Sequence, residues 1–206
     1  MILEVIPVGP MAANCYLVGC EETNQGAVID PGGDGQRILA RAEQLGLKIK
    51  YIINTHGHID HIASNDEVKI VTGAKVLIHQ LDAIMLTDAQ ANLSAWMGRV
   101  FTFEPADEQL QDGDIITVGN LQLKVIHTPG HTPGGICIHL DDHLWSGDTL
   151  FDGSVGRTDF PGGNHQALVE AIKTKLFLLP DNVRVYPGHG PATTIGKEKQ
   201  SNPFVK

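Results

Sequence analysis

The chain has 206 residues, of which 42% are hydrophobic, and its formal net charge at pH 7 is −9. This length suffices for one sizeable core, so we expect residues 1–206 to form a single domain. The negative charge disfavours nucleic acid as a partner, because phosphate contacts need a basic surface, and no apolar run approaches the ~20 residues of a membrane span. Residues 1–7 lack the basic segment of a signal peptide, and the three cysteines are odd in number, so we expect reduced thiols and a cytoplasmic protein.

The first half of the chain predicts a hairpin, a helix and a strand, in that order. Residues 14–18 and 26–30 form the predicted hairpin, which ends at an aspartate. Residues 35–45 place apolar side chains at helical spacing. The apolar run within residues 49–54 then indicates a buried strand, and α/β folds place their ligand sites at the carboxyl ends of such strands.

The second half of the chain repeats this order after a middle region. Residues 80–91 and 93–100 look helical, and residues 101–113 look like a connector. The repeated elements are a hairpin at residues 135–140 and 143–146, a helix at residues 164–178 and a strand at residues 183–186. This repetition predicts two similar halves that meet face to face. We therefore expect an α/β fold with two sheets sandwiched between outer helices, a four-layer αββα arrangement, with the site in the cleft where the sheet ends meet.

The richest stretch of potential ligands directly follows the strand at residues 49–54. It reads His56, Gly57, His58, Ile59, Asp60 and His61. Three imidazoles and a carboxylate in six residues suit zinc, iron or manganese, and a mere polar turn would not need them. On a turn this tight, His56 and His58 can point to one side and Asp60 and His61 to the other. One loop could therefore serve two adjacent metal ions.

Three further potential ligands follow other short strand-like segments. His131, Asp148 and His189 each have a neighbouring glycine, which lets the backbone bring the side chain close to a metal. Each residue alone is typical of a turn or a cap. In this order, however, the four blocks resemble the metallo-β-lactamase fold superfamily over essentially the whole chain.

The resemblance implies a centre of two divalent metal ions, zinc in the first place, with iron or manganese as alternatives. One metal site would take His56, His58 and His131, the other Asp60, His61 and His189, and Asp148 would bridge the two. A hydroxide between two cations forms near neutral pH and is a strong nucleophile. The resemblance thus implies a metal-dependent hydrolase, with Asp60 and Asp148 as the carboxylates of the catalytic centre.

A second resemblance narrows the substrate class. Residues 155–160, which include Arg157, and residues 188–204 are similar to the short bacterial glyoxalase II-like branch, the hydroxyacylglutathione hydrolases. This implies hydrolysis of a small thiol-derived thioester, with Arg157 binding a carboxylate of the thiol. A structural role for Arg157, paired with Asp159 or Asp152, is equally compatible with the sequence. The longer glyoxalases II have a tyrosine where this chain has Pro191, which puts glutathione itself in doubt.

Alternatives share the same ligand pattern. A persulfide dioxygenase would hold a single iron on His56, His131 and Asp148, leaving open positions for oxygen and thiolate. Lactonases and nucleases of the same fold, and a non-catalytic metal-binding module, are further alternatives. The three cysteines lie within or beside predicted strands, so we expect no acyl-cysteine intermediate. We interpret Trp96, Met97 and other apolar residues of the middle region as core rather than as a substrate wall.

Overall fold

Two six-stranded sheets dominate the structure, a computed structural model that describes residues 1–205. The first sheet has the order β1-β2-β3-β4-β5-β6 and consists of β1 (Ile2–Val8), β2 (Ala13–Gly19), β3 (Gln25–Ile29), β4 (Lys48–Asn54), β5 (Lys75–His79) and β6 (Glu108–Leu110). The second has the order β14-β13-β10-β9-β8-β7 and consists of β7 (Ile115–Val118), β8 (Leu121–His127), β9 (Ile136–Leu140), β10 (His143–Gly147), β13 (Arg184–Pro187) and β14 (Thr193–Thr194). A small two-stranded sheet is formed by β11 (Leu150–Phe151) and β12 (Ser154–Val155).

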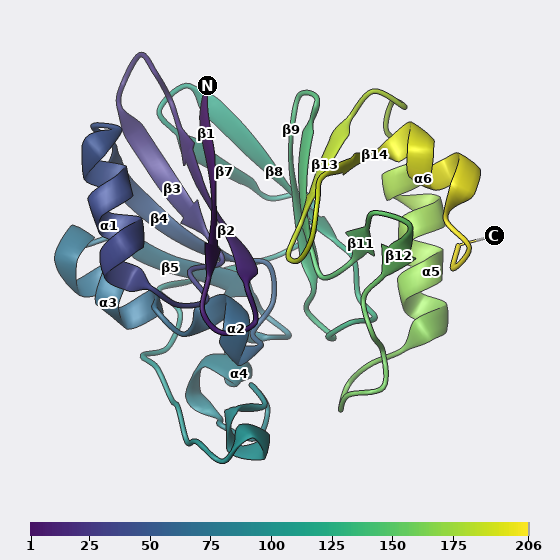
Figure 1. The fold of residues 1–206 in the computed structure, drawn as a ribbon, viewed down its shortest axis with the longest axis horizontal. Coiled ribbons are helices and arrows are strands. Elements are labelled where there is room, and N and C mark those ends of the chain that lie inside the picture. The colour runs from purple at the N-terminus through teal and green to yellow at the C-terminus, as the bar shows by residue number, and fades with distance from the viewer. Residues whose placement is uncertain (206) are drawn as a thin grey trace.

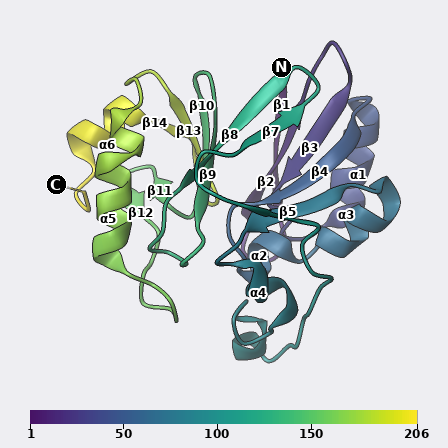
Figure 2. The ribbon, with the colours of Figure 1, turned by 180° about the vertical axis from the view of Figure 1, so that it is seen from behind.

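Helices cover the outer face of each sheet. On the side of the first sheet lie α1 (Gly35–Gln44) and α3 (Asn65–Thr72) (Figure 1). On the side of the second sheet lie α5 (His165–Thr174) and α6 (Ile195–Ser201). Figure 2 shows from behind that the two sheets face each other between these helices. The predicted αββα layering is therefore confirmed.

The same supersecondary unit occurs in both sheets. In the first, β2 and β3 are antiparallel, α1 follows, and β4 returns parallel to β3. In the second, β9 and β10 are antiparallel, α5 follows, and β13 returns parallel to β10. Because two parallel strands end at the same edge, the residues after β3 and β4, and those after β10 and β13, are gathered in pairs.

Three apolar clusters fill the spaces between the layers. One lies between the first sheet and its helices, one between the two sheets, and one between the second sheet and α5. Adjacent residues of β4 show how a central strand serves two layers: Ile52 belongs to the first cluster and Ile53 to the second, and both are fully buried. Alternate side chains of a strand point to opposite faces, so a strand covered on both faces must be apolar throughout. Each such side chain contributes about 1.5–3 kcal/mol by its burial.

The middle region contains less helix than the sequence predicts. Only α4 (Ala83–Thr87) and the 3₁₀ turn η1 (Ser94–Met97) form there, and the predicted connector contributes strand β6. The reason is the buried side chain of Asn92, whose Nδ2 donates to the carbonyls of Met85 (3.1 Å) and Phe101 (2.9 Å) and folds the segment back on itself. Leu93 follows with a φ of 70°, which a helix does not permit.

The predicted helix at residues 164–178 is also shorter than expected. It ends as an α-helix at Thr174, and a 3₁₀ turn η2 (Leu176–Leu178) follows. Lys175 is the C-cap of α5, with a φ of −119°, and its ammonium group donates to the carbonyl of His127 (2.8 Å). The apolar side of the segment still packs on the second sheet, since Leu168, Ile172 and Leu176 are fully buried.

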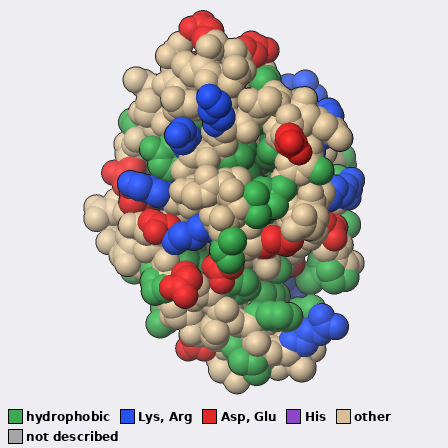
Figure 3. All heavy atoms as spheres, turned by 90° about the vertical axis from the view of Figure 1, so that its left-hand side faces the viewer, with side chains coloured by type: hydrophobic (Ala, Val, Ile, Leu, Met, Phe, Trp, Pro, Cys, Tyr) green, Lys and Arg blue, Asp and Glu red, His purple; other side chains and the backbone are tan. Residues whose placement is uncertain are grey.

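The surface on the side of α1 and α3 has charged side chains of both signs. Figure 3 shows acidic and basic side chains interspersed there, with no concentration of basic groups on this face. Within residues 1–205, no helix is long and apolar enough to cross a membrane.

Candidate metal centre

The loop that follows β4 is fixed at both ends by buried amides. The side chains of Asn54 and Asn65 donate to each other's oxygens at 3.1 and 2.8 Å. The same Asn54 amide also donates to the carbonyl of His61 (3.3 Å), at the short helix α2 (Ile59–Ile62). All three residues are buried. Residues 55–62 therefore leave the sheet in one defined conformation.

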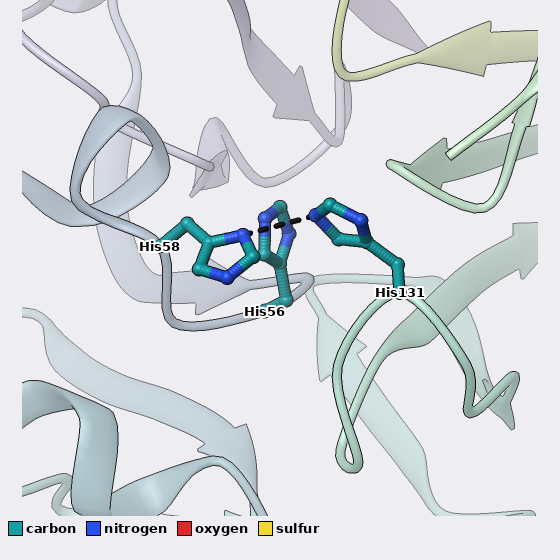
Figure 4. A group of neighbouring side chains, drawn as sticks. All are labelled: His56, His58 and His131. Atoms are coloured by element: carbon teal, nitrogen blue, oxygen red, sulfur yellow. Dashed lines mark hydrogen bonds between the residues drawn. The ribbon is translucent and has the colours of Figure 1, made fainter. Parts of the chain in front are cut away.

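Three predicted ligands form the first half of the centre (Figure 4). The ring centroid of His56 lies 4.8 Å from that of His58 and 4.7 Å from that of His131. The Nδ1 atom of His58 is 2.9 Å from the Nε2 atom of His131. His131 comes from the loop between β8 and β9 of the second sheet, so the two sheets contribute to one group. One nitrogen of each ring lies within 4.8 Å of the others.

A second group lies beside the first. Donor atoms of Asp60, His61 and His189 also lie within 4.8 Å of one another. Asp148 is between the groups: its Oδ1 is 3.5 Å from Nε2 of His61, and its Oδ2 is 3.5 Å from Nε2 of His131 and 3.8 Å from Nε2 of His189. The structure thus gathers all seven side chains that the sequence singles out as ligands.

Two backbone positions next to the centre leave no space for a side chain. A Cβ atom on Gly188 would lie 2.2 Å from Oδ1 of Asp148 and 2.7 Å from Cε1 of His61. A Cβ atom on Gly32 would lie 1.5 Å from the backbone oxygen of Asp60. Only glycine lets the chain approach these atoms so closely.

Hydrogen bonds orient most of the imidazoles. The Nδ1 atom of His61 is 3.0 Å from Oδ2 of Asp30, that of His131 is 2.7 Å from the carbonyl oxygen of Arg157, and that of His56 is 3.2 Å from Oγ1 of Thr55. Each bond holds the proton on Nδ1 and leaves Nε2 directed at the centre. His58 instead directs Nδ1 inward.

Several inward-facing atoms have no protein partner. Within residues 1–205, the buried atoms without a hydrogen bond include Nε2 of His56, Nε2 of His61 and Oδ1 of Asp148. Leaving a polar atom buried and unpaired costs about 1–3 kcal/mol, and more when it is charged. Converging lone pairs of imidazole and carboxylate are the donor set that divalent metal ions bind. The residues therefore fit a divalent cation.

The electrostatics differ between the two groups. Burial, reinforced by the neighbouring imidazoles, lowers the pKa of His56, and the same causes lower the pKa of His58 to about 3. These rings are neutral and can bind a metal without first losing a proton. Burial also lowers the pKa of His61, but Asp148 and two further carboxylates outweigh it and raise that pKa to about 10. Positive charge is therefore favoured at the second group.

Asp30 contacts the candidate centre and was missed by sequence reasoning. It is buried at the end of β3 with a φ of 53°, and it accepts bonds from the backbone nitrogen (2.7 Å) and Oγ1 (2.6 Å) of Thr55 as well as facing His61. The signal was present in the repeat, because Asp30 follows the first hairpin as Asp148 follows the second.

Asp82 is a second residue that sequence reasoning missed, and no pattern in the sequence marks it. Its carboxylate is fully buried and accepts hydrogen bonds from Oγ1 of Thr132 (2.6 Å) and the backbone nitrogen of Gly134 (2.6 Å). Burial raises the pKa of Asp82. The carboxylate ties the start of α4 to the loop that carries His131, although in the sequence it looked like part of a helix.

A cavity of about 600 Å³ lies beside the centre. Ligands from both groups line it, together with Arg157 and Phe160. The guanidinium of Arg157 makes two hydrogen bonds of 2.7 Å to Asp159 and lies 3.8 Å from the centroid of the Phe160 ring. Trp96 and Met97, which we interpreted as core, are instead 63% and 56% exposed and line this cavity.

Two facing sheets between helices, with a cluster of histidines and aspartates at their common edge, define a metallo-hydrolase. The chain belongs to the metallo-β-lactamase superfamily, whose family model matches residues 8–189.

Among curated relatives, the chain is 37% identical to the hydroxyacylglutathione hydrolase GloC of Haemophilus influenzae, covering 100% of this chain and 98% of that protein. It is 38% identical to the probable metallo-hydrolase YqgX of Bacillus subtilis, covering 97% and 95%.

Solved structures of similar proteins include the BLEG-1 B3 metallo-β-lactamase, with 36% identity, a TM-score of 0.94 and full coverage of both chains. ETHE1 from Myxococcus xanthus has 33% identity and a TM-score of 0.84, covering 98% of this chain and 84% of that one. TTHA1623 in a di-iron-bound form has 35% identity and a TM-score of 0.87, covering 98% and 99%.

Proposed function

We propose that this metallo-hydrolase cleaves thioesters of the hydroxyacylglutathione type at a centre of two divalent metal ions. The observation that carries the proposal is the second group of donor atoms, on Asp60, His61 and His189, which, like the first, lie within 4.8 Å of one another. The similarity to GloC over the full length supports the thioester, and the di-iron form of TTHA1623 supports a two-metal centre. Both zinc and iron remain compatible with this donor set.

The proposed ligands act in two groups. One cation would be held by His56, His58 and His131, the other by Asp60, His61 and His189, and both by Asp148. When bound, two cations lower the pKa of a water molecule and polarise the carbonyl under attack. The protein's own part is to hold the imidazoles in one orientation through Asp30 and the carbonyl of Arg157.

The leaving group and the thiols of the chain support this chemistry. A thiolate departs readily, so the site needs no strong general acid. Cys15 and Cys137 are disfavoured as nucleophiles, because burial raises the pKa of Cys15 and raises that of Cys137 to about 11. Hydrogen bonds with Thr23 and Asn120 lower the pKa of Cys20 to about 7, but Cys20 lines neither cavity at the centre. Cys15, Cys20 and Cys137 are free, which supports our proposal that the enzyme acts in the reducing cytoplasm. We also propose that residues 1–206 act as a single domain.

A mononuclear iron dioxygenase that oxidises persulfides is the second candidate. It would use His56, His131 and Asp148, the two-histidine, one-carboxylate set of many iron oxygenases. The similarity to ETHE1 supports it.

Metal content and three activity assays separate these candidates. The purified protein is loaded with zinc or with iron under anaerobic conditions, and bound metal per chain is measured. Each form is then assayed for thioester hydrolysis, for oxygen uptake with a persulfide and for β-lactam hydrolysis. We expect two metal ions per chain and hydrolysis of the thioester above that of the β-lactam. One iron per chain with oxygen uptake and no hydrolysis would replace the first proposal by the second.

A further inference from the structure

A second cavity of about 480 Å³ adjoins the one that contains the centre. Its walls come from the turn between β1 and β2, from the loop after β3 and from the segment around η1. The two cavities have four lining residues in common, namely Met11, Ile59, Asp60 and Met97. Since Asp60 belongs to the proposed metal ligands, the second cavity reaches the same centre from another side.

The second cavity combines apolar walls with a single cationic side chain. Met11, Met97 and Phe101 are 51%, 56% and 42% exposed, and all three line it. Exposed apolar side chains gathered in one depression are typical of a binding site. Methionine adapts its shape to different partners at low cost. Arg99 supplies the cation in this wall.

The two arginines near the centre differ in their availability. Arg157 is already bound to Asp159 by two hydrogen bonds and packs on Phe160. Arg99 is exposed and makes no salt bridge or side-chain hydrogen bond with any of residues 1–205. Asp34 lines the same cavity, and its carboxylate accepts a hydrogen bond from the backbone nitrogen of Gly9 (3.0 Å). Of the two guanidinium groups, Arg99 is the one free to bind an anion.

The arrangement of the cavities matches a substrate that is cut near its middle. The reacting carbonyl of a thioester must lie at the centre, and the acyl group and the thiol extend from it in different directions. Two adjoining cavities, one lined by Phe160 and Trp96 and the other by Phe101 and Arg99, offer space for one arm each.

We propose that the second cavity binds the thiol arm of the substrate and that Arg99 binds a carboxylate of that arm. This inference rests on the proposed thioester hydrolase, and it moves the binding of the thiol's carboxylate from Arg157 to Arg99. A guanidinium binds a carboxylate through two parallel hydrogen bonds, which fixes direction as well as charge. The substrate class is then a thioester whose thiol carries a carboxylate within reach of this wall.

Two substrates with the same acyl group test the proposal. One is a hydroxyacylglutathione, and the other is the same hydroxyacyl thioester of N-acetylcysteamine, whose thiol has no carboxylate. For Arg99→Met, which keeps an unbranched stem, we expect KM to rise about tenfold for the glutathione thioester with kcat nearly unchanged, because the lost contact binds ground and transition states alike. We expect KM for the neutral thioester to stay within twofold.

Three further variants complete the experiment. Arg99→Lys should recover much of the loss, because it restores the charge without the paired geometry. Arg37→Met, which removes a guanidinium bound to the carbonyl of Pro7, is the control and should change neither KM. If Arg99→Met alters KM equally for both substrates, or if Arg157→Met alone produces the selective loss, the proposal is overturned.

A binding measurement separates this proposal from the proposed function. Free glutathione is titrated calorimetrically into the wild-type protein and into Arg99→Met. If no thioester is hydrolysed but glutathione binds to the wild type and about tenfold more weakly to the variant, the proposed function fails and the cavity assignment stands. Equal binding, or none, overturns the assignment.

Discussion

Replacing Asp30 by asparagine tests how the centre is held in place. Asp30 accepts two bonds from Thr55 and faces Nδ1 of His61 at 3.0 Å. Asparagine has the same shape and tolerates the φ of 53° at this position, so the backbone can stay as it is. Its oxygen can still accept the backbone nitrogen of Thr55, but its NH₂ group then faces the N–H of His61, donor against donor.

The expected cost follows from the burial of these groups. A hydrogen bond to a charged group contributes about 1.5–3 kcal/mol, and a buried donor left unpaired adds to the loss, so Asp30→Asn should lower the free energy of unfolding by ~2–4 kcal/mol. Losing the partner that orients a histidine ligand typically weakens metal affinity by roughly 10–100-fold.

Urea denaturation of metal-free protein and competition with a zinc chelator measure the two effects. Asp34→Asn is the matched control, because Asp34 also has a positive φ (51°) but is exposed. We expect this control to change the free energy of unfolding by about 0.5 kcal/mol or less. Equal effects of the two substitutions in both assays would refute the assignment of Asp30 as a positioning residue.

Three further predictions concern metal content, nucleophile and pH. Asp60→Ala should lower bound zinc from two ions per chain to one, as measured by elemental analysis, and an unchanged content would remove Asp60 from the ligand set. Cys137→Ala should keep kcat within a few-fold, since the thiol is buried and its pKa is about 11, whereas an acyl-cysteine detected by mass spectrometry would contradict this. Burial and the stacked ring of His127 lower the pKa of His79 to about 4. As the pH falls from 6.5 towards 4, the unfolded chain therefore takes up a proton on this residue before the folded chain does, and the free energy of unfolding should decrease. Urea denaturation at pH 7 and pH 5 measures this effect: the free energy of unfolding should decrease less for His79→Gln than for the wild type. An equal decrease would disprove the contribution of His79.

Local patterns were sufficient to predict the layers of the fold. The apolar residues of β4 and the helical spacing within α1 each predicted an element within one or two residues of its observed bounds. The middle region was predicted wrongly, because its conformation depends on the amide of Asn92 reaching carbonyls seven and nine residues away. Periodicity does not register a single buried hydrogen-bonding side chain.

The seven side chains of the centre were all singled out in the sequence, because histidines and aspartates that follow several predicted strands are typical of a metal site. Of the residues that orient or surround them, Arg157 was singled out, whereas Asp30, Asp82 and Arg99 were not. Asp82 contacts residues 50 or more positions away, and Arg99 lies in a segment whose apolar residues are as typical of core as of a binding wall. Only the three-dimensional structure distinguishes an arginine that is bound by a carboxylate from one that is free.

The position of the centre between the two halves has a consequence for folding. The ligand loop at residues 56–61 belongs to the first half, while His131, Asp148 and His189 belong to the second. Cations bound by both sets would cross-link segments that are 70 to 133 residues apart in the chain. Such cross-links restrict the unfolded chain and add the free energy of metal binding to that of folding. If the proposed cations bind, metal supply would determine how firmly the two halves stay docked. Amide hydrogen exchange along the strand ends that face each other should then slow when metal is added.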